Sequence, residues 1–139
     1  MDRNISYDSA GRILHTNKAQ IVPADVLPTF HHIYDKHYTY DISGNLIQTI
    51  LIEDHSSAAL KTNITNYSNY DSHKNPFRSI KVPFIEIRDV RYSMNNHKYT
   101  EWLEGYGDET PTVISWLDHY GAYEYNEFDY PTFAIYDCE

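Results

Sequence analysis

A chain of 139 residues is long enough to bury a hydrophobic core as one domain, without disulfides or a structural metal. Its 20 acidic and 11 basic residues give a formal net charge of −9, which disfavours binding to nucleic acid or to anionic membranes. The single cysteine, Cys138, excludes an intrachain disulfide. The sequence also has no run of about 18 apolar residues, which a membrane-spanning helix would require. With 14 tyrosines and ordinary numbers of glycines and prolines, residues 1–139 are expected to form a single β domain rather than a disordered chain.

Residues 5–22 predict a β-hairpin with a tight turn. The carboxylate of Asp8 can accept hydrogen bonds from backbone amides that follow it, and Gly11 can adopt the left-handed conformation that closes a type I turn with a G1 bulge. Pro23 and Pro28 then remove two backbone donors. Residues 23–30 are therefore expected to form a connection or a sheet edge.

The same turn pattern recurs as YTYDISG at residues 38–44, with Asp41 and Gly44 in the turn positions. Before it, residues 30–34 and 37–41 are expected to be extended, with a turn at Asp35 and Lys36. The return strand at 46–52, LIQTILI, has apolar residues at both odd and even positions. Both faces of that strand are therefore expected to be at least partly covered.

The second half of the chain predicts more strands. Residues 60–70 read as a strand and 71–76 as a turn, whereas 77–92 fit neither period and predict an irregular or short helical cap. After a turn at 93–96, strands are expected near 97–104, 111–118, 120–126 and 131–137, with turns at 105–108, 120–121 and 126–129. The predicted fold is an all-β, curved antiparallel meander that is either open or partly closed into a barrel-like sheet.

The third copy of the turn pattern, at residues 123–131, is degraded. Asp129 stands where the other two copies have glycine, which leaves open whether the turn is of the same type.

The Y-x-Y-D-x-x-G motif resembles the YD (Rhs-type) repeat, which forms hairpins in extracellular bacterial shells. In addition, the order of YSNYDSHKNPF at 67–77, SMNN at 93–96 and YEYN at 123–126 is similar to that in a family of cell-envelope lipoprotein domains of unknown function, from gut-type Gram-negative bacteria, with a porin-like antiparallel sheet. This resemblance covers about residues 5–137. It implies export, an extracytoplasmic location and no known reaction. Met1 falls close to the first repeat, so we expect that an upstream export or lipid-anchor segment is missing.

Histidines at 31, 32 and 37, with Asp35 between them, are residue types that bind metal ions. Nothing in their spacing fixes a tetrahedral arrangement, and the sequence has neither H-E-x-x-H nor C-x-x-C. Structural or solvent-exposed histidines are the favoured interpretation, and we predict no metal and no cofactor.

Acidic residues could supply the two carboxylates of a glycoside hydrolase, which must lie ~5 to 10 Å apart across a cleft. The candidates are Glu101, Glu104, Asp108, Glu109 and Asp118. Such residues in strand ends and turns are usually only solvated, so the sequence favours a protein without catalysis, and no catalytic residue is assigned.

Aromatic residues are frequent in the predicted C-terminal meander and could form a flat binding platform for sugar rings or peptide prolines. They are Trp102, Tyr106, Trp116, Tyr120 and Tyr123. The favoured alternative is that the two tryptophans pack inside the sheet as a cross-strand pair.

The sequence thus predicts a non-catalytic binding or structural module of the bacterial envelope, with a glycan or an envelope protein as its partner. The alternatives are a carbohydrate-active hydrolase and a subunit of a self-assembling surface structure.

Overall fold

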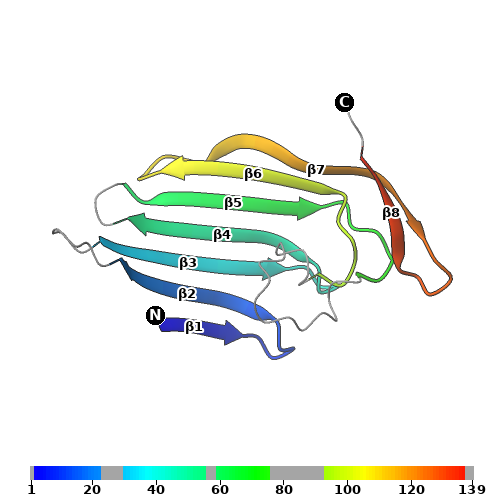
Figure 1. Ribbon diagram of the computed structural model, residues 1–139, viewed down its shortest axis with the longest axis horizontal. Coiled ribbons are helices and arrows are strands. Elements are labelled where there is room, and N and C mark those ends of the chain that lie inside the picture. Colours follow the sequence, from blue (N-terminus) through cyan, green and yellow to red (C-terminus); the bar gives the residue numbers. More distant parts are fainter. Residues whose placement is uncertain (1, 23–29, 56–58, 76–92, 137–139) are drawn as a thin grey trace. The chain divides into compact units, whose positions relative to one another are not determined.

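The computed structural model describes residues 2–22, 30–55, 59–75 and 93–136, and in this part of the chain it contains eight β-strands and no helix (Figure 1). The strands are β1 (Asp2–Tyr7), β2 (Ile13–Val22), β3 (Phe30–Tyr40), β4 (Leu46–His55), β5 (Lys61–Ser68), β6 (Tyr99–Tyr106), β7 (Thr112–Tyr125) and β8 (Pro131–Tyr136). Each strand is hydrogen-bonded to its neighbour along the chain, in the order β1 to β8. The all-β antiparallel meander is therefore confirmed, in its open form.

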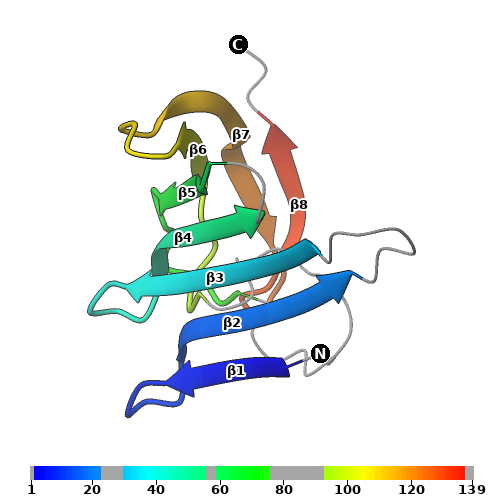
Figure 2. The ribbon, with the colours of Figure 1, turned by 90° about the vertical axis from the view of Figure 1, so that its left-hand side faces the viewer.

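The turn between β1 and β2, at the lower left of Figure 2, has the geometry that its sequence predicts. The backbone N–H of Gly11 donates to the carbonyl oxygen of Asp8 at 3.0 Å, and Gly11 has a φ of +75°. The Asp8 carboxylate accepts hydrogen bonds from the backbone N–H groups of Ala10 and Arg12, at 2.9 and 2.8 Å. The β1–β2 register shifts between Ser6 and Tyr7, as a bulge next to such a turn requires.

The turn between β3 and β4 repeats this arrangement. The N–H of Gly44 donates to the carbonyl of Asp41 at 3.1 Å, and Gly44 has a φ of +87°. The Asp41 carboxylate accepts from the N–H of Asn45 at 2.8 Å. Two distant stretches of sequence therefore build the same turn from the same local hydrogen bonds.

The turn between β7 and β8 is of the same type, although it lacks glycine. The N–H of Asp129 donates to the carbonyl of Asn126 at 3.0 Å, and the Asn126 side-chain oxygen accepts from the N–H groups of Phe128 and Tyr130. Asp129 has a φ of +70°. Aspartate is one of the few residues other than glycine that adopts this conformation at moderate cost, so it can replace glycine here.

The predicted turn at Asp35 and Lys36 is wrong, because β3 runs without interruption from Phe30 to Tyr40. Both residues are paired with β2, Asp35 with Asn17 and Lys36 with Thr16. The polar pair looked like a break in an apolar strand, but β2 is equally polar at the paired positions. A partner strand that satisfies the backbone groups keeps these residues extended.

The predicted turn at Tyr120 and Gly121 is also wrong, because both residues lie inside β7. The pairing with β8 shifts between Tyr120 and Ala122, so Gly121 sits at an irregularity of the ladder. Glycine within a strand often marks a bulge, since it has no side chain to pack.

Instead of a simple turn, residues 93–96 contain a bend and an isolated antiparallel bridge between Asn95 and Lys74. Of the predicted connection at 23–30, only Phe30 is described, and it begins β3; the rest of that connection and the cap predicted at 77–92 lie outside the described residues.

The chain divides into two compact units. Unit 1 comprises Met1–Tyr38, Thr49–Thr65 and Trp102–Ile114, and unit 2 comprises Thr39–Gln48, Asn66–Glu101 and Ser115–Glu139. Every boundary between them falls inside a strand, so the two units are interleaved in sequence.

The described core of unit 2 is rich in polar groups. Leu46 and Ser93 are fully buried, and Tyr67 is buried beside polar residues such as Asn96 and His97. The backbone N–H of Leu46 donates to the Ser93 hydroxyl at 3.0 Å. Buried polar groups are tolerated when they are hydrogen-bonded, so this core depends on specific pairing as well as on apolar burial.

No helix in the described part of the chain has the length and hydrophobicity that crossing a bilayer requires.

Candidate functional site

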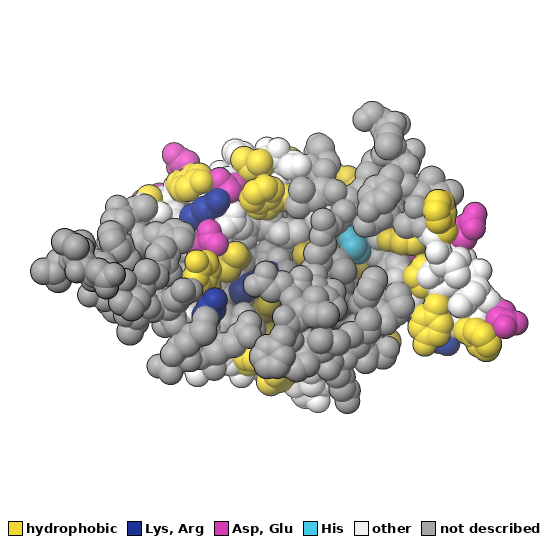
Figure 3. Space-filling model, viewed as in Figure 1, with side chains coloured by type: hydrophobic (Ala, Val, Ile, Leu, Met, Phe, Trp, Pro, Cys, Tyr) yellow, Lys and Arg dark blue, Asp and Glu magenta, His cyan; other side chains and the backbone are white. Residues whose placement is uncertain are grey.

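The β7–β8 hairpin of unit 2 carries the largest group of exposed aromatic side chains among the described residues. Phe128 in the turn is 66% exposed, Phe133 on β8 59% and Tyr130 40%. In Figure 3, hydrophobic side chains (yellow) and acidic ones (magenta) lie together at the right-hand end, where Figure 1 places this hairpin. These three residues are the best candidates for a contact surface.

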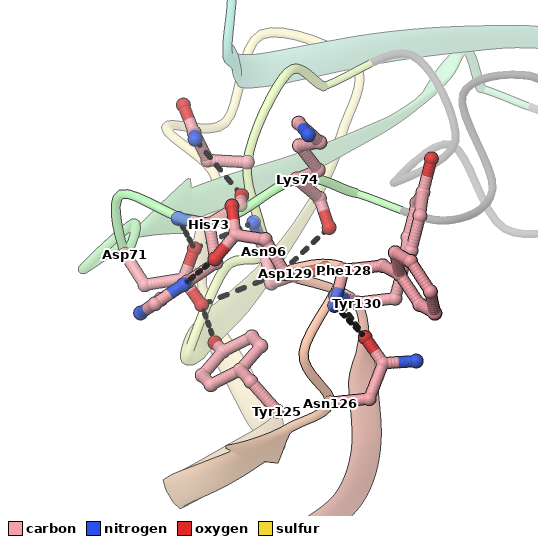
Figure 4. A network of polar contacts seen from close by, with 10 residues as sticks. Asp71, His73, Lys74, Asn96, Tyr125, Asn126, Phe128, Asp129 and Tyr130 are labelled. Atoms are coloured by element: carbon pink, nitrogen blue, oxygen red, sulfur yellow. Dashed lines mark hydrogen bonds and ion pairs between the residues drawn. The ribbon is translucent and has the colours of Figure 1, made fainter.

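The hairpin is attached to residues 71–75 through the Asp71 carboxylate (Figure 4). One Asp71 oxygen accepts from the backbone N–H groups of His73 and Asn96, at 3.0 and 3.1 Å. The other accepts from the Asn96 side-chain amide at 3.3 Å and from the hydroxyl of Tyr125 at the end of β7. A carboxylate has about four acceptor sites, and here all four are used. The Asp71 carboxylate therefore links its own segment to Asn96 and to the end of β7.

The imidazole of His73 provides a second attachment. Its Nδ1 contacts the Asp129 carboxylate, and its ring stacks on that of Tyr125 with 3.7 Å between the ring centres. The hydrogen bond from His73 holds the pKa of the Asp129 carboxyl below its ordinary value of 3.8. Burial, followed by the bond to Asp71, raises the pKa of Tyr125. The turn that presents Phe128 is thus fixed by its internal hydrogen bonds and by two side-chain contacts.

Phe128 and Tyr130 lie on the side of the turn opposite Tyr125 (Figure 4). The ammonium group of Lys74 lies 6.0 Å from the centre of the Tyr130 ring. A cation at this distance from a ring face is attracted to it, so Tyr130 has a preferred position.

Only part of the predicted aromatic platform can be placed. On β6, Tyr106 is 47% exposed and Trp102 is half-buried, and both belong to unit 1. Tyr123 belongs to unit 2, where its hydroxyl donates to the His97 carbonyl at 2.7 Å. The side chains of Trp116 and Tyr120 lie outside the described residues, so the expected tryptophan pair stays a prediction.

Next to Tyr106, the candidate acid Glu104 is already engaged. Its carboxylate is 2.6 Å from the Lys61 ammonium and accepts a 2.6 Å hydrogen bond from the Tyr106 hydroxyl. The hydrogen bond from Lys61 lowers the pKa of Glu104, and the same contact raises the pKa of Lys61. A general acid needs a raised pKa, whereas the surroundings of Glu104 lower its pKa and favour the ionised carboxylate.

Of the other candidate acids, Glu101, Asp108 and Glu109 have described side chains. In unit 2, the carboxylate of Glu101 accepts from the side-chain amide of Asn66 at 2.8 Å. In unit 1, Asp108 and Glu109 lie in the exposed turn after β6. The side chain of Asp118 lies outside the described residues.

One group of described residues could hold a metal ion: His15, Asp35 and His37 of unit 1. The sequence pointed to Asp35 and His37 but missed His15, which is twenty residues from Asp35 and meets it only through the β2–β3 pairing. The side chains of His31 and His32 lie outside the described residues.

The exposed residues Phe128, Tyr130 and Phe133 were also missed. Their signal was their place in and just after the third copy of the turn pattern, since side chains at a hairpin turn are usually exposed.

The chain matches no protein-family model, and no similar curated protein or solved structure was found.

Proposed function

We propose that this domain is a non-catalytic binding module of the bacterial cell envelope, acting outside the cytoplasm, and that its ligand is an uncharged glycan. The observation that carries the proposal is the exposure of Phe128, Tyr130 and Phe133 on a hairpin whose turn is held in place. The envelope location rests on the resemblance of the YxYDxxG hairpins and of the segments at 67–77, 93–96 and 123–126 to envelope lipoprotein domains.

The rigidity of the hairpin favours binding through its aromatic rings. Three large apolar side chains exposed on one hairpin leave apolar surface in water, and such patches commonly mark interaction sites. Aromatic rings contribute large contact area at small entropic cost, because they have few rotatable bonds. Since the Asp71 and His73 contacts already fix the turn, little further ordering would be required when a flat sugar face stacks on Phe128 or Tyr130.

The net charge of the chain supports the choice of an uncharged ligand. A formal charge of −9 repels anionic polymers over the distance that salt leaves unscreened. Two acidic residues, Glu127 and Asp129, flank Phe128 in the sequence and add to this repulsion locally. Neutral glycans are therefore expected to bind better than acidic ones.

A carbohydrate-active hydrolase is the alternative. It would need one carboxyl group kept protonated and another free to attack or to activate water. Asp71 has its acceptor sites filled, and Glu104 is held ionised by Lys61. These engagements favour binding over hydrolysis.

An array of neutral and acidic glycans, probed with the labelled domain, tests the proposal. We expect binding to a subset of neutral glycans, lost in a Phe128→Ala/Tyr130→Ala double variant. The matched control is Ile42→Ala, which removes a fully exposed apolar side chain from the β3–β4 turn and should bind like wild type.

Four results would overturn the proposal. Absence of binding to any glycan would refute it, as would equal binding by the double variant. Capture of an envelope protein through the same aromatic residues would replace the glycan by a protein partner. Release of sugar from a bound glycan would establish the hydrolase instead.

A further inference from the structure

Strands β2 and β3 place three side chains of metal-binding type on one face of the sheet in unit 1. His15 pairs directly with His37 across the two strands, and Asp35 precedes His37 by two residues. Directly paired residues share a face, and so do residues two apart in a strand. The imidazoles and the carboxylate therefore project from the same side of the β2–β3 ladder.

Their ligand atoms already converge. The nitrogen and oxygen atoms of the three side chains lie within 4.8 Å of one another. The Nε2 of His37 is 3.3 Å from Oδ1 of Asp35, and the Nε2 of His15 contacts the same oxygen. With metal–ligand bonds of ~2.0 to 2.1 Å, neighbouring ligands of a tetrahedral ion are about 3.3 Å apart. The His37–Asp35 separation matches this spacing, and small side-chain rotations would bring His15 to it.

We propose that His15, Asp35 and His37 bind a divalent late first-row transition metal ion, for which Zn²⁺ is the natural probe. Two imidazoles with one carboxylate are a ligand set for such ions, whereas Mg²⁺ and Ca²⁺ prefer oxygen ligands only. The three side chains are 31%, 34% and 51% exposed, in chain order, so an ion can reach them from solvent. Three protein ligands leave one tetrahedral position for water or an external ligand.

The competing interpretation is a hydrogen-bonded cluster that only joins β2 to β3. In that case one Asp35 oxygen is shared by two imidazoles, whose rings stack with 4.7 Å between their centres. A metal ion would take the place of the shared protons. The two interpretations therefore differ in one measurable property, the affinity of the metal-free protein for Zn²⁺.

The first test is a calorimetric titration of the tag-free, metal-free protein with ZnCl₂ at neutral pH. We expect one ion per chain in wild type and no comparable binding of Mg²⁺. His15→Gln and Asp35→Asn should each weaken Zn²⁺ binding at least about 100-fold, because even second-shell changes often cost 10- to 100-fold. The matched control is His73→Gln, which removes another histidine from a histidine–aspartate contact and should leave Zn²⁺ binding unchanged.

A second measurement needs no variant. In the imidazole ¹⁵N spectrum of wild type, one equivalent of Zn²⁺ should shift the resonances of His15 and His37 and leave that of His73 in place. Failure to bind Zn²⁺, or binding that shifts other histidines only, would overturn the proposal. Unchanged Zn²⁺ affinity in folded His15→Gln and Asp35→Asn proteins would overturn it as well.

Discussion

Replacing Gly11 by alanine isolates the cost of the left-handed backbone conformation in the β1–β2 turn. Gly11 has a φ of +75°, and a Cβ atom built on it would meet nothing within 4 Å. The substitution therefore introduces no clash with a neighbouring element. An L-residue in the left-handed region costs roughly 1–2 kcal/mol. The restricted unfolded chain returns ~0.4 to 1 kcal/mol. We expect Gly11→Ala to lower the free energy of unfolding by about 1 kcal/mol, the difference between the backbone strain and the gain from the restricted unfolded chain.

Urea denaturation followed by circular dichroism measures this change. With an m-value of about 1–3 kcal/mol/M, the midpoint should fall by roughly 0.3–1 M. Gly11→Asn is the matched control, since asparagine tolerates the left-handed region better than alanine and should be less destabilising. The reasoning is refuted if Gly11→Ala is as stable as wild type, or if alanine and asparagine cost the same.

Three further predictions use other contacts. Gly44→Val should cost about 1–2 kcal/mol or more, because a β-branched residue would be held at a φ of +87°, and an unchanged melting temperature would contradict the turn geometry. The pKa of Asp129 is lowered by His73, so its contribution to stability is complete above its ordinary pKa of 3.8 and is lost as pH falls through the folded-state value. Asp129→Asn should therefore flatten the acid side of a plot of urea midpoint against pH, and an unaltered slope would count against the contact. Burial raises the pKa of Tyr70 to about 12, so stability should fall as pH rises from 10 towards 12. Tyr70→Phe should reduce that fall. If the stability of the variant falls with pH as steeply as that of wild type, the burial of the Tyr70 hydroxyl is not its cause.

The turns could be predicted from sequence because their determinants are local. Asp8 and Asp41 accept hydrogen bonds from backbone groups no more than four residues away, and the glycines they require follow three residues later. Asp129 lay at the limit of this reasoning. Its left-handed conformation follows the pattern, but the sequence alone did not decide between this turn type and another.

The two mistaken turns depended on non-local information. Whether Asp35 and Lys36 form a turn or continue a strand is decided by β2, which pairs with both. Likewise, Gly121 stays inside β7 because β8 continues beside it through an irregular register. Single-residue turn preferences carry no information about the strand alongside.

The group of His15, Asp35 and His37 could not be predicted from the sequence for the same reason. His31 and His32 attracted attention because they are near Asp35 in the chain, whereas His15 is brought to it by strand register. A one-residue slip of the β2–β3 register would turn His15 to the other face. Cross-strand groups of this kind become visible only when the pairing is known.

Pairing every strand with its successor also bears on how the chain reaches its native state. Contacts between consecutive strands have low contact order, so each closure loses little chain entropy and folding can spread from one hairpin to the next. The exception is β5 with β6, between which residues 69–98 intervene. That pairing closes the longest loop in the meander, and it is where we expect the rate-limiting step.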